Sequence, residues 1–356
     1  MSSEIDEAKN IMNLACKSLS RQVNIMEVCG THTVSIFRNG IKSILPRQVN
    51  LLTGPGCPVC VTGQGYIDIV LQLADRNDCV IATYGDMMRV PGKKTTLEAK
   101  QSNGNIKIVL SSEDALRLAK ENPGKNVIFV AVGFETTAPA TAVIVKEAAV
   151  EGIDNLFILS GHKLVVPAMR ALLVDKNDNI DGFLCPGHVS AITGFGAFNE
   201  IVQQFSRPCV VAGFEPVQIV KGLAEICRQL AEGKPELKSV YTAVVTEKGN
   251  EEAQKLLHEC FEPADGYWRG LGRIKNSTLK LKDKYSRLDA FKRFGITETA
   301  TEETENCRCG EVLCGLITPD KCGLFGRNCT PDSPAGPCMV SSEGACAAWF
   351  KYGEPV

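Results

Sequence analysis

Short apolar runs alternate with amphipathic stretches along most of the chain. Residues 5–20 carry apolar side chains at helical spacing, from Ile5 to Leu19, which predicts an N-terminal amphipathic helix. Apolar runs of strand length follow at 49–53, 79–83, 127–132, 156–159, 183–184, 209–212 and 241–245. Between several of them the pattern favours helices, at 65–74, 112–121, 138–151 and 216–232. Strands and helices at this cadence predict an α/β fold with largely parallel sheets.

Four of the predicted strands end in a similar way. Glycine follows the apolar run and is accompanied by a bulky or polar side chain, in ATYGD (82–86), VGFE (132–135), SGHK (160–163) and AGFE (212–215). Loops at the carboxyl ends of parallel strands line the clefts of open α/β sheets, so these segments are candidates for a cleft. The alternative is that each glycine only permits the turn out of the strand. Their recurrence favours two similar α/β units with a boundary near residue 122.

Three parts are therefore expected along the chain. Residues 1–122 would form an α/β domain with the N-terminal helix, residues 123–240 a second α/β domain, and residues 241–356 a C-terminal region. The Thr/Glu-rich segment at 296–306 is typical of a linker. The segment after it is rich in cysteine, glycine and proline and carries few helix or strand signals, so we expect a metal or covalent bonds to hold it together.

Charge and hydropathy exclude several classes of protein. A formal net charge of −2 over 356 residues gives no electrostatic reason to expect nucleic acid or an anionic membrane as partner. No apolar run approaches the roughly 20 residues that span a bilayer. The N-terminus, MSSEIDEAKN, is polar and lacks the apolar core of a secretory signal. We therefore expect a cytoplasmic protein, in which cysteines serve metal binding or redox chemistry more often than structural disulfides.

The chain has sixteen cysteines, and seven of them lie between Cys307 and Cys346. Zinc sites favour two close Cys-x2–4-Cys pairs, whereas the intervals here are long and irregular and include no histidine. Thiolate ligation from loops rich in glycine and proline is typical of an iron–sulfur cluster. The pattern favours a [4Fe–4S] cluster over structural zinc, disulfides or free thiols, but spacing alone does not select four ligands from seven.

A second cysteine motif, GPGCPVC, lies at residues 54–60 between a predicted strand and a predicted helix. A Cys-x-x-Cys pair at a helix N-terminus is exposed to the positive end of the helix dipole, which favours the thiolate. Two intervening residues also allow a disulfide to close. Cys57 and Cys60 are therefore candidates for a redox-active dithiol, with half of a zinc site or two incidental cysteines as the alternatives.

The third motif is EVCGTHT at residues 27–33. Cys29 in this polar loop could be a nucleophile or an iron ligand, with His32 as a hydrogen-bond donor or proton carrier. A buried, inert cysteine is the alternative. The isolated cysteines Cys16, Cys79, Cys209, Cys227 and Cys260 are expected to be small core residues.

These segments, in this order, resemble the HypD family of [NiFe]-hydrogenase maturation proteins. The matching motifs are EVCGTHT (27–33), GPGCPVC (54–60), TYGDMMRVPG (83–92), GFETTAP (133–139), GHKLVVPAM (161–169), CPGHVSAITG (185–194), VAGFEP (211–216), GYWRGLG (266–272) and CMVSSEGACAAW (338–349). The resemblance covers nearly the whole chain from about residue 24.

The resemblance implies a set of ligands and roles. The family's cluster pattern, Cys-x14-Cys-x6-Cys-x16-Cys, falls on four cysteines of this chain: Cys307, Cys322, Cys329 and Cys346. Cys309, Cys314 and Cys338 remain as rivals, with Cys338 the strongest because it lies in a tight Gly-Pro-Cys loop. Cys29 would bind the iron being assembled, as Fe(II) in an Fe(CN)2CO intermediate, and Cys57 and Cys60 would form the redox-active pair.

The resemblance also implies partners. Family members act with a small HypC-type chaperone, receive cyanide through a HypE-type protein and serve the hydrogenase large subunit. The working hypothesis is a chain of electron transfer from cluster to dithiol to nascent iron, which requires that the C-terminal segment lie close to residues 54–60. Two other classes stay open: a stand-alone thiol–disulfide reductase that depends on the cluster, and a docking module in which the cluster is purely structural.

Overall fold

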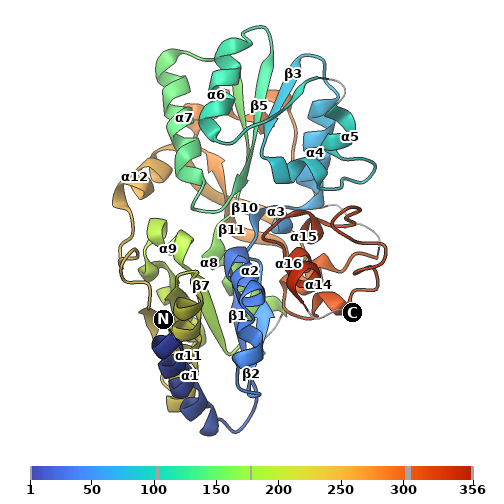
Figure 1. The fold of residues 1–356 in the computed structure, drawn as a ribbon. Coiled ribbons are helices and arrows are strands. Elements are labelled where there is room, and N and C mark those ends of the chain that lie inside the picture. Colours follow the sequence, from blue (N-terminus) through green and yellow to red (C-terminus); the bar gives the residue numbers. More distant parts are fainter. Residues whose placement is uncertain (1, 102–103, 177–178, 301–305, 354–356) are drawn as a thin grey trace.

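Two parallel β-sheets carry the fold, one in each half of the molecule (Figure 1). The computed structural model describes residues 2–101, 104–176, 179–300 and 306–353. The strand order is β2-β1-β7-β8-β9 in the first sheet and β4-β3-β5-β6 in the second, and every pairing within them is parallel. The predicted α/β class with largely parallel sheets and a cysteine-rich C-terminal region is confirmed.

The strands are β1 (Val23–Glu27), β2 (Val49–Thr53), β3 (Cys79–Thr83), β4 (Ile106–Ile108), β5 (Asn126–Gly133), β6 (Leu156–His162), β7 (Gly182–Pro186), β8 (Cys209–Ala212), β9 (Leu237–Ser239), β10 (Phe261–Trp268) and β11 (Gly272–Leu281). The last two form a separate antiparallel hairpin.

The α-helices are α1 (Ser2–Lys17), α2 (Gly30–Arg38), α3 (Pro58–Val61), α4 (Gln64–Ala74), α5 (Leu97–Lys100), α6 (Ser112–Glu121), α7 (Ala138–Glu151), α8 (Val165–Ala171), α9 (Gly187–Thr193), α10 (Asn199–Phe205), α11 (Pro216–Glu232), α12 (Glu251–Cys260), α13 (Ala290–Phe294), α14 (Cys309–Leu313), α15 (Pro337–Val340) and α16 (Ala345–Tyr352). The 3-10 helices are η1 (Ile41–Ile44), η2 (Gly85–Arg89), η5 (Phe195–Phe198), η6 (Asp283–Leu288) and η7 (Pro319–Lys321), and η4 (Leu172–Lys176) is a π-helical turn. None of these helices is both long and apolar enough to cross a membrane.

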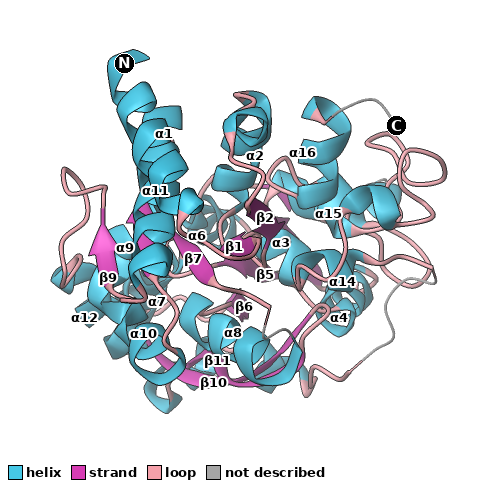
Figure 2. Ribbon diagram, turned by 90° about the horizontal axis from the view of Figure 1, so that it is seen from below, coloured by secondary structure: helices cyan, strands magenta, loops and turns pink. Residues whose placement is uncertain are grey.

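Alternation of side chains along the strands gives each sheet two buried faces. In β5, Val127 and Phe129 pack with α6 and α7, whereas Ile128 and Val130 face the opposite way into a large core shared with the first sheet. Helices α1 and α11 lie side by side over the outer face of the first sheet, as Figure 2 shows from below. The chain thus has one central core with a helical layer on each outer side.

One predicted strand is wrong. Residues 241–245 form a turn, in which the N–H groups of Val244 and Val245 both bond to the carbonyl of Tyr241. The sheet ends at β9, just before this segment. Val245 is buried and Tyr241 contacts the ring of Phe214, whereas Ala243 and Val244 are exposed. A short apolar run therefore need not join a sheet.

The two sheets cut across the expected domain boundaries. Strands β3 and β5 lie on opposite sides of residue 122 but pair within one sheet, while β1 pairs with β7, more than a hundred residues further on. The first sheet is therefore built from both ends of the α/β part of the chain, and the second sheet from its middle. The hairpin β10–β11 and residues 306–353, drawn in orange and red in Figure 1, lie where the two halves meet.

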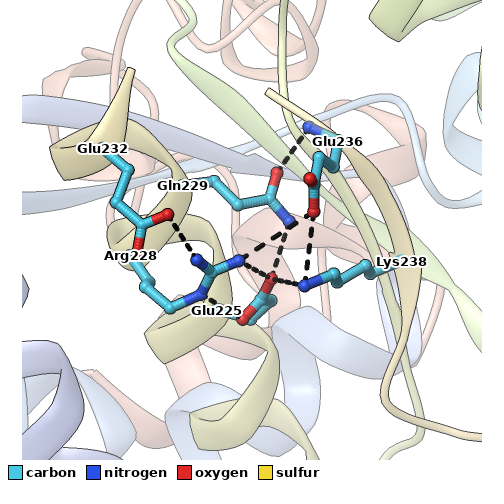
Figure 3. A network of polar contacts seen from close by, with 6 residues as sticks. All are labelled: Glu225, Arg228, Gln229, Glu232, Glu236 and Lys238. Carbon is cyan, nitrogen blue, oxygen red and sulfur yellow. Dashed lines mark hydrogen bonds and ion pairs between the residues drawn. The ribbon is translucent and has the colours of Figure 1, made fainter. Parts of the chain in front are cut away.

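A polar network fastens β9 to α11 (Figure 3). Arg228 donates two hydrogen bonds to the carboxylate of Glu225, at 2.8 and 2.9 Å, and a further one to Glu232. Lys238 on β9 lies 3.0 Å from the same Glu225 carboxylate, and Gln229 also donates to it. The network holds the edge strand against the helix far from the cleft described next.

Candidate functional site

A cleft of about 420 Å3 lies between the carboxyl ends of the two sheets. In the first sheet it is lined by residues that follow β1 and β7, and in the second by residues that follow β3 and β5. Each of these pairs flanks the point where the strand order reverses direction, which is where open α/β sheets bind ligands. The two switch points face each other, so the cleft is a strong candidate for the site of chemistry.

Cys29 lies in this cleft at the start of α2. The backbone N–H groups of Thr31 and His32 point at its thiol, and Glu27 accepts a hydrogen bond from its backbone N–H at 3.1 Å. Burial raises the pKa of Cys29 to about 12; the His32 N–H opposes this rise, and the carboxylates of Glu343 and Glu27 add to it. The thiol is therefore protonated in the metal-free protein, and a bound metal ion would be needed to form the thiolate.

Two carboxyl groups and a histidine line the cleft together with Cys29: Asp86, Glu343 and His188. Glu343 accepts a hydrogen bond from Thr31 at 2.6 Å, and Asp86 accepts one from Ser341 at 3.0 Å. The sequence alone does not predict a function for any of the three side chains. The only signal was their presence in TYGDMMRVPG, CPGHVSAITG and CMVSSEGACAAW, because single carboxylates and histidines are common on loops.

His32 does not face the thiol of Cys29. Its Nε2 bonds to the carbonyl oxygen of Gly213 at 3.0 Å, and its ring packs against Phe214. Burial lowers the pKa of His32 to about 4, so the imidazole is neutral near pH 7. Its backbone N–H reaches Cys29, but the proposed role of its side chain as a proton carrier stays a prediction.

Cys57 and Cys60 form a disulfide beside the Cys29 loop. Cys57 precedes the short helix α3, and both cysteines are buried, with exposed fractions of 3% and 0%. The N–H of Gly30 donates to the carbonyl of Gly56 at 3.0 Å, and a side chain at position 56 would overlap the backbone of Cys29. A residue without a side chain is thus required for the two loops to lie this close.

The C-terminal cysteines converge on a small cavity of their own. All four residues that the family pattern selects line it: Cys307, Cys322, Cys329 and Cys346. The remaining wall is mostly apolar and includes Val312, Leu324 and Met339, and the cavity has no histidine or carboxylate among its lining residues. A set of donors made only of thiols suits iron–sulfur clusters, so the residues present fit such a group.

Cys309, rather than Cys338, is the rival that shares the cavity wall. The thiol of Cys309 contacts those of Cys307, Cys338 and Cys346. Cys338 is fully buried behind the wall, where contact with the Cys309 and Cys346 thiols raises its pKa. The thiol of Cys314 turns away and lies 3.5 Å from the carbonyl of Gly270. Within the described residues no set of three Cys, His, Asp or Glu side chains adopts metal-binding geometry, so the ligand set stays a prediction.

The disulfide and the cysteine cavity are neighbours. Helix α3 packs against α15 and α14, which carry Cys338 and Cys309. The Sγ atom of Cys60 lies 4.0 Å from the carbonyl oxygen of Pro337, the residue before Cys338. The proximity that the electron-transfer hypothesis required between the C-terminal segment and residues 54–60 is therefore present.

The chain is similar to proteins of hydrogenase formation over nearly its full length. The family described as HypD, "Hydrogenase formation hypA family", matches residues 5–353. The hydrogenase expression/formation protein HupD of Azotobacter chroococcum is 42% identical over 342 residues, which are 94% of this chain and 90% of that protein. The hydrogenase maturation factor HypD of Azotobacter vinelandii is 42% identical over 341 residues, with the same coverage of both chains. HypD of Escherichia coli K12 is 42% identical over 334 residues, covering 93% of this chain and 90% of that protein.

Proposed function

The chain belongs to the HypD family of hydrogenase maturation factors, and from that membership we propose that it is the scaffold on which an Fe(CN)2CO unit is assembled. A small HypC-type chaperone would share the site, a HypE-type protein would supply cyanide, and the finished unit would pass to the large subunit of a [NiFe]-hydrogenase in the cytoplasm. One observation carries the proposal. Cys29 lies in the cleft at the facing switch points of both sheets, with the Cys57–Cys60 disulfide held against its loop.

Cys29 is suited to hold the iron cargo. It is a soft ligand at the start of a helix, where two backbone N–H groups stabilise a thiolate once a metal has displaced the proton. A single protein thiolate leaves most coordination positions of the iron open, as the addition of cyanide and CO requires. The volume of the cleft, about 420 Å3, leaves room for a ligand from a partner protein.

Two carboxyl groups near Cys29, one buried and one half-buried, position its loop. Glu27 accepts hydrogen bonds from the Cys29 N–H and from the Thr33 hydroxyl, which fixes the loop between β1 and α2. Glu343 reaches the same loop from the cysteine-rich region through its bond with Thr31. The geometry of Cys29 thus depends on the C-terminal region as well as on the sheet that carries it.

Cys57 and Cys60 would exchange two electrons as disulfide and dithiol. The four cysteines at 307, 322, 329 and 346 would hold a [4Fe–4S] cluster, which supplies one-electron transfer when bound. Pro337 and Cys338 on α15 lie between this cavity and Cys60, so the chain places its two candidate redox groups side by side.

Burial of the disulfide argues against the stand-alone thiol–disulfide reductase. A generic protein disulfide must be attacked by an accessible thiolate, but the exposed fraction of Cys60 is 0% and that of Cys57 is 3%. A buried disulfide is better suited to exchange electrons with a group bound inside the protein, such as iron at Cys29. The docking-module alternative requires no redox change at all and predicts that Cys57→Ser leaves maturation intact.

Infrared spectroscopy tests the proposal directly. The protein would be purified anaerobically together with its small chaperone, as wild type and as Cys29→Ala, Cys57→Ser and Cys60→Ser. We expect stretching bands of bound cyanide and CO in the wild type, their loss in Cys29→Ala, and loss of hydrogenase maturation in all three variants. Cys79→Ala is the matched control, because Cys79 is equally buried but lies in the core of the second sheet.

Two outcomes would count against the assembly scaffold. Bands that persist in Cys29→Ala would place the iron elsewhere. A wild-type protein that carries iron and sulfide but shows no such bands would favour the reductase, which should then reduce generic disulfides without a partner and be indifferent to the loss of Cys29.

A further inference from the structure

The tip of the β10–β11 hairpin contacts both the residues that follow the disulfide and helix α14 of the cysteine-rich region. Trp268 pairs with Thr62, and the N–H of Arg269 donates to the carbonyl of Val61 at 2.9 Å, immediately after Cys60. On its other side the tip meets α14, where a side chain at position 270 would overlap the backbone of Gly310. The hairpin tip that carries Arg269 therefore borders both candidate redox groups.

Among the residues that the structure describes, Arg269 is a buried cation without a matching anion. Only 2% of its surface is exposed, and its guanidinium donates one hydrogen bond, to Gln64 Oε1 at 3.3 Å. Its Nε atom has no hydrogen-bond partner, and no carboxylate of the described residues lies within 4.0 Å of the guanidinium. A buried charge that lacks a counter-ion destabilises the fold, so we expect an anion nearby in the working protein.

The cysteine cavity is the place where such an anion would lie. The residue after Arg269 packs against Gly310 on α14, and Cys309, the first residue of that helix, lines the cavity. The carboxyl group of Glu298, whose Oε1 atom is buried, interacts with a different cation, Lys163. Arg308 also lines the cavity, but it is already paired with Glu311. Arg269 is thus the buried cation whose charge remains available to the thiolates.

We propose that Arg269 is the counter-cation of an anionic iron–sulfur cluster in the cysteine cavity and that its charge raises the reduction potential of that cluster. This inference rests on the proposed function, which assigns the cluster to the cavity. A cluster held by four thiolates is a net anion and gains a further negative charge when it accepts one electron. A fixed positive charge in a buried, weakly screening environment stabilises the reduced form more than the oxidised form.

Redox titration of charge variants tests the role of Arg269. Full-length wild type, Arg269→Gln and Arg269→Lys would be prepared anaerobically, assayed for iron and acid-labile sulfide, and titrated with the reduced cluster followed by electron paramagnetic resonance. Arg269→Gln should lower the ratio of reduced to oxidised cluster at a fixed potential by about tenfold, a shift of about 59 mV for a one-electron couple. Arg269→Lys should stay close to the wild type because it keeps the charge.

Arg273→Gln is the matched control. Arg273 belongs to the same hairpin, but its side chain is 64% exposed and is paired with Asp265, so its removal should leave the potential unchanged. A potential that is the same in wild type and Arg269→Gln would overturn the inference. Equal shifts in Arg269→Gln and Arg269→Lys would also overturn it, because the loss would then come from shape and not from charge.

Failure to retain a cluster is informative as well. If Arg269→Gln folds by circular dichroism but holds less iron and sulfide than Arg269→Lys, the counter-cation role is supported. If both variants fold and lose the cluster equally, or if both fail to fold, charge is not what Arg269 contributes. A folded wild type that holds no iron and sulfide contradicts the proposed function itself, whereas a wild-type cluster indifferent to the charge at position 269 contradicts only this inference.

Discussion

Glu135 shows how single buried groups near the cleft are held in unusual ionisation states. It follows Phe134 in the loop after β5, and its Oε1 accepts the N–H of Val165 at 3.0 Å. Its Oε2 is buried and has no hydrogen-bond partner in the described part of the chain. Burial raises the pKa of Glu135 to about 7, against the opposing effect of backbone hydrogen bonds. A carboxyl group in this state is protonated in the folded protein under mildly acidic conditions.

The raised pKa of Glu135 predicts a pH-dependent contribution to stability. Between about pH 4.5 and 7 the folded state keeps a proton that the unfolded state has released, so the free energy of unfolding falls as pH rises through this range. Glu135→Gln should remove this contribution. Relative to the wild type, the free energy of unfolding of the variant should therefore increase by up to about 3 kcal/mol between pH 4 and pH 8. Urea unfolding at both pH values measures it, and a difference independent of pH would contradict the assignment.

At the scale of residues, the sequence identified the thiols better than their surroundings. Cys29, Cys57 and Cys60 stood out because cysteine is rare and its chemistry narrow. The fold packs the loop of the Cys57–Cys60 disulfide against the loop of Cys29. Asp86 and Glu343 did not stand out, since their part depends on which loops the fold brings together. The sequence also favoured Cys338 over Cys309 as the rival ligand, because a tight loop around Cys338 is visible in the sequence and a shared cavity wall is not.

At the scale of elements, the Glu225 network on α11 supports the edge of the first sheet (Figure 3). Burial opposes ionisation of Glu225, but hydrogen bonds from Arg228, Gln229 and Lys238 outweigh it and hold the pKa at about 2. The folded state thus keeps Glu225 ionised at pH values where the unfolded chain is protonated. The stability that this provides is fully present above about pH 4.5 and is lost as pH falls towards 2.

We expect Glu225→Gln to lower the free energy of unfolding by about 1–2 kcal/mol at pH 7, after allowance for solvent screening of the network. The deficit should shrink as pH falls from 4.5 towards 2. Glu4→Gln is a suitable control, because Glu4 pairs with Lys221 at 3.4 Å but is 53% exposed, and its loss should change stability by less than about 0.5 kcal/mol. Equal effects of the two substitutions would mean that the network adds nothing beyond a surface ion pair.

The sequence predicted the long helices well and the short edge strands poorly. Helix α6 has a complete capping box between Ser111 and Asp114, and α11 begins at Pro216 and ends at the left-handed Gly233, so local signals define both. Strands β4 and β9 are three residues long and partly exposed, which leaves no apolar run to find. The hairpin β10–β11 was missed for the same reason: in β10, buried and exposed positions are mixed and a bulge interrupts the pairing.

At the scale of the whole molecule, long-range contacts decide what sequence patterns leave open. Parallel sheets were predictable from their apolar strands, but the pairing of β1 with β7 joins residues more than 150 positions apart. No local signal carries that information. The cysteine-rich region likewise joins both halves, through Ser341 to Asp86 in one and through Glu343 to Thr31 in the other. The cleft therefore exists only when all three parts have assembled.

The docking of the hairpin tip is the contact on which this assembly can be tested most cleanly. Gly270 and Gly272 both adopt left-handed backbone angles, with φ of +77° and +73°. A side chain at position 270 would overlap the backbone of Gly310, whereas nothing lies within 4 Å of a side chain at position 272. Gly272→Ala should lower the free energy of unfolding by the left-handed penalty alone, about 1–2 kcal/mol. Gly270→Ala should add the cost of overpacking, about another 1–3 kcal/mol.

Hydrogen exchange separates local loosening from global loss. In Gly270→Ala, amides of α14 and of residues 61–64 should exchange faster than in Gly272→Ala. The reason is that a displaced tip loses its contacts with both Val61 and Gly310. Amides of β5 and β6, in the far half of the molecule, should be unaffected by either substitution beyond the change in global stability. If the two variants unfold at the same urea concentration and exchange alike, the hairpin tip does not connect the disulfide to the cysteine-rich region in solution. The close placement of the two redox candidates would then lose its structural support.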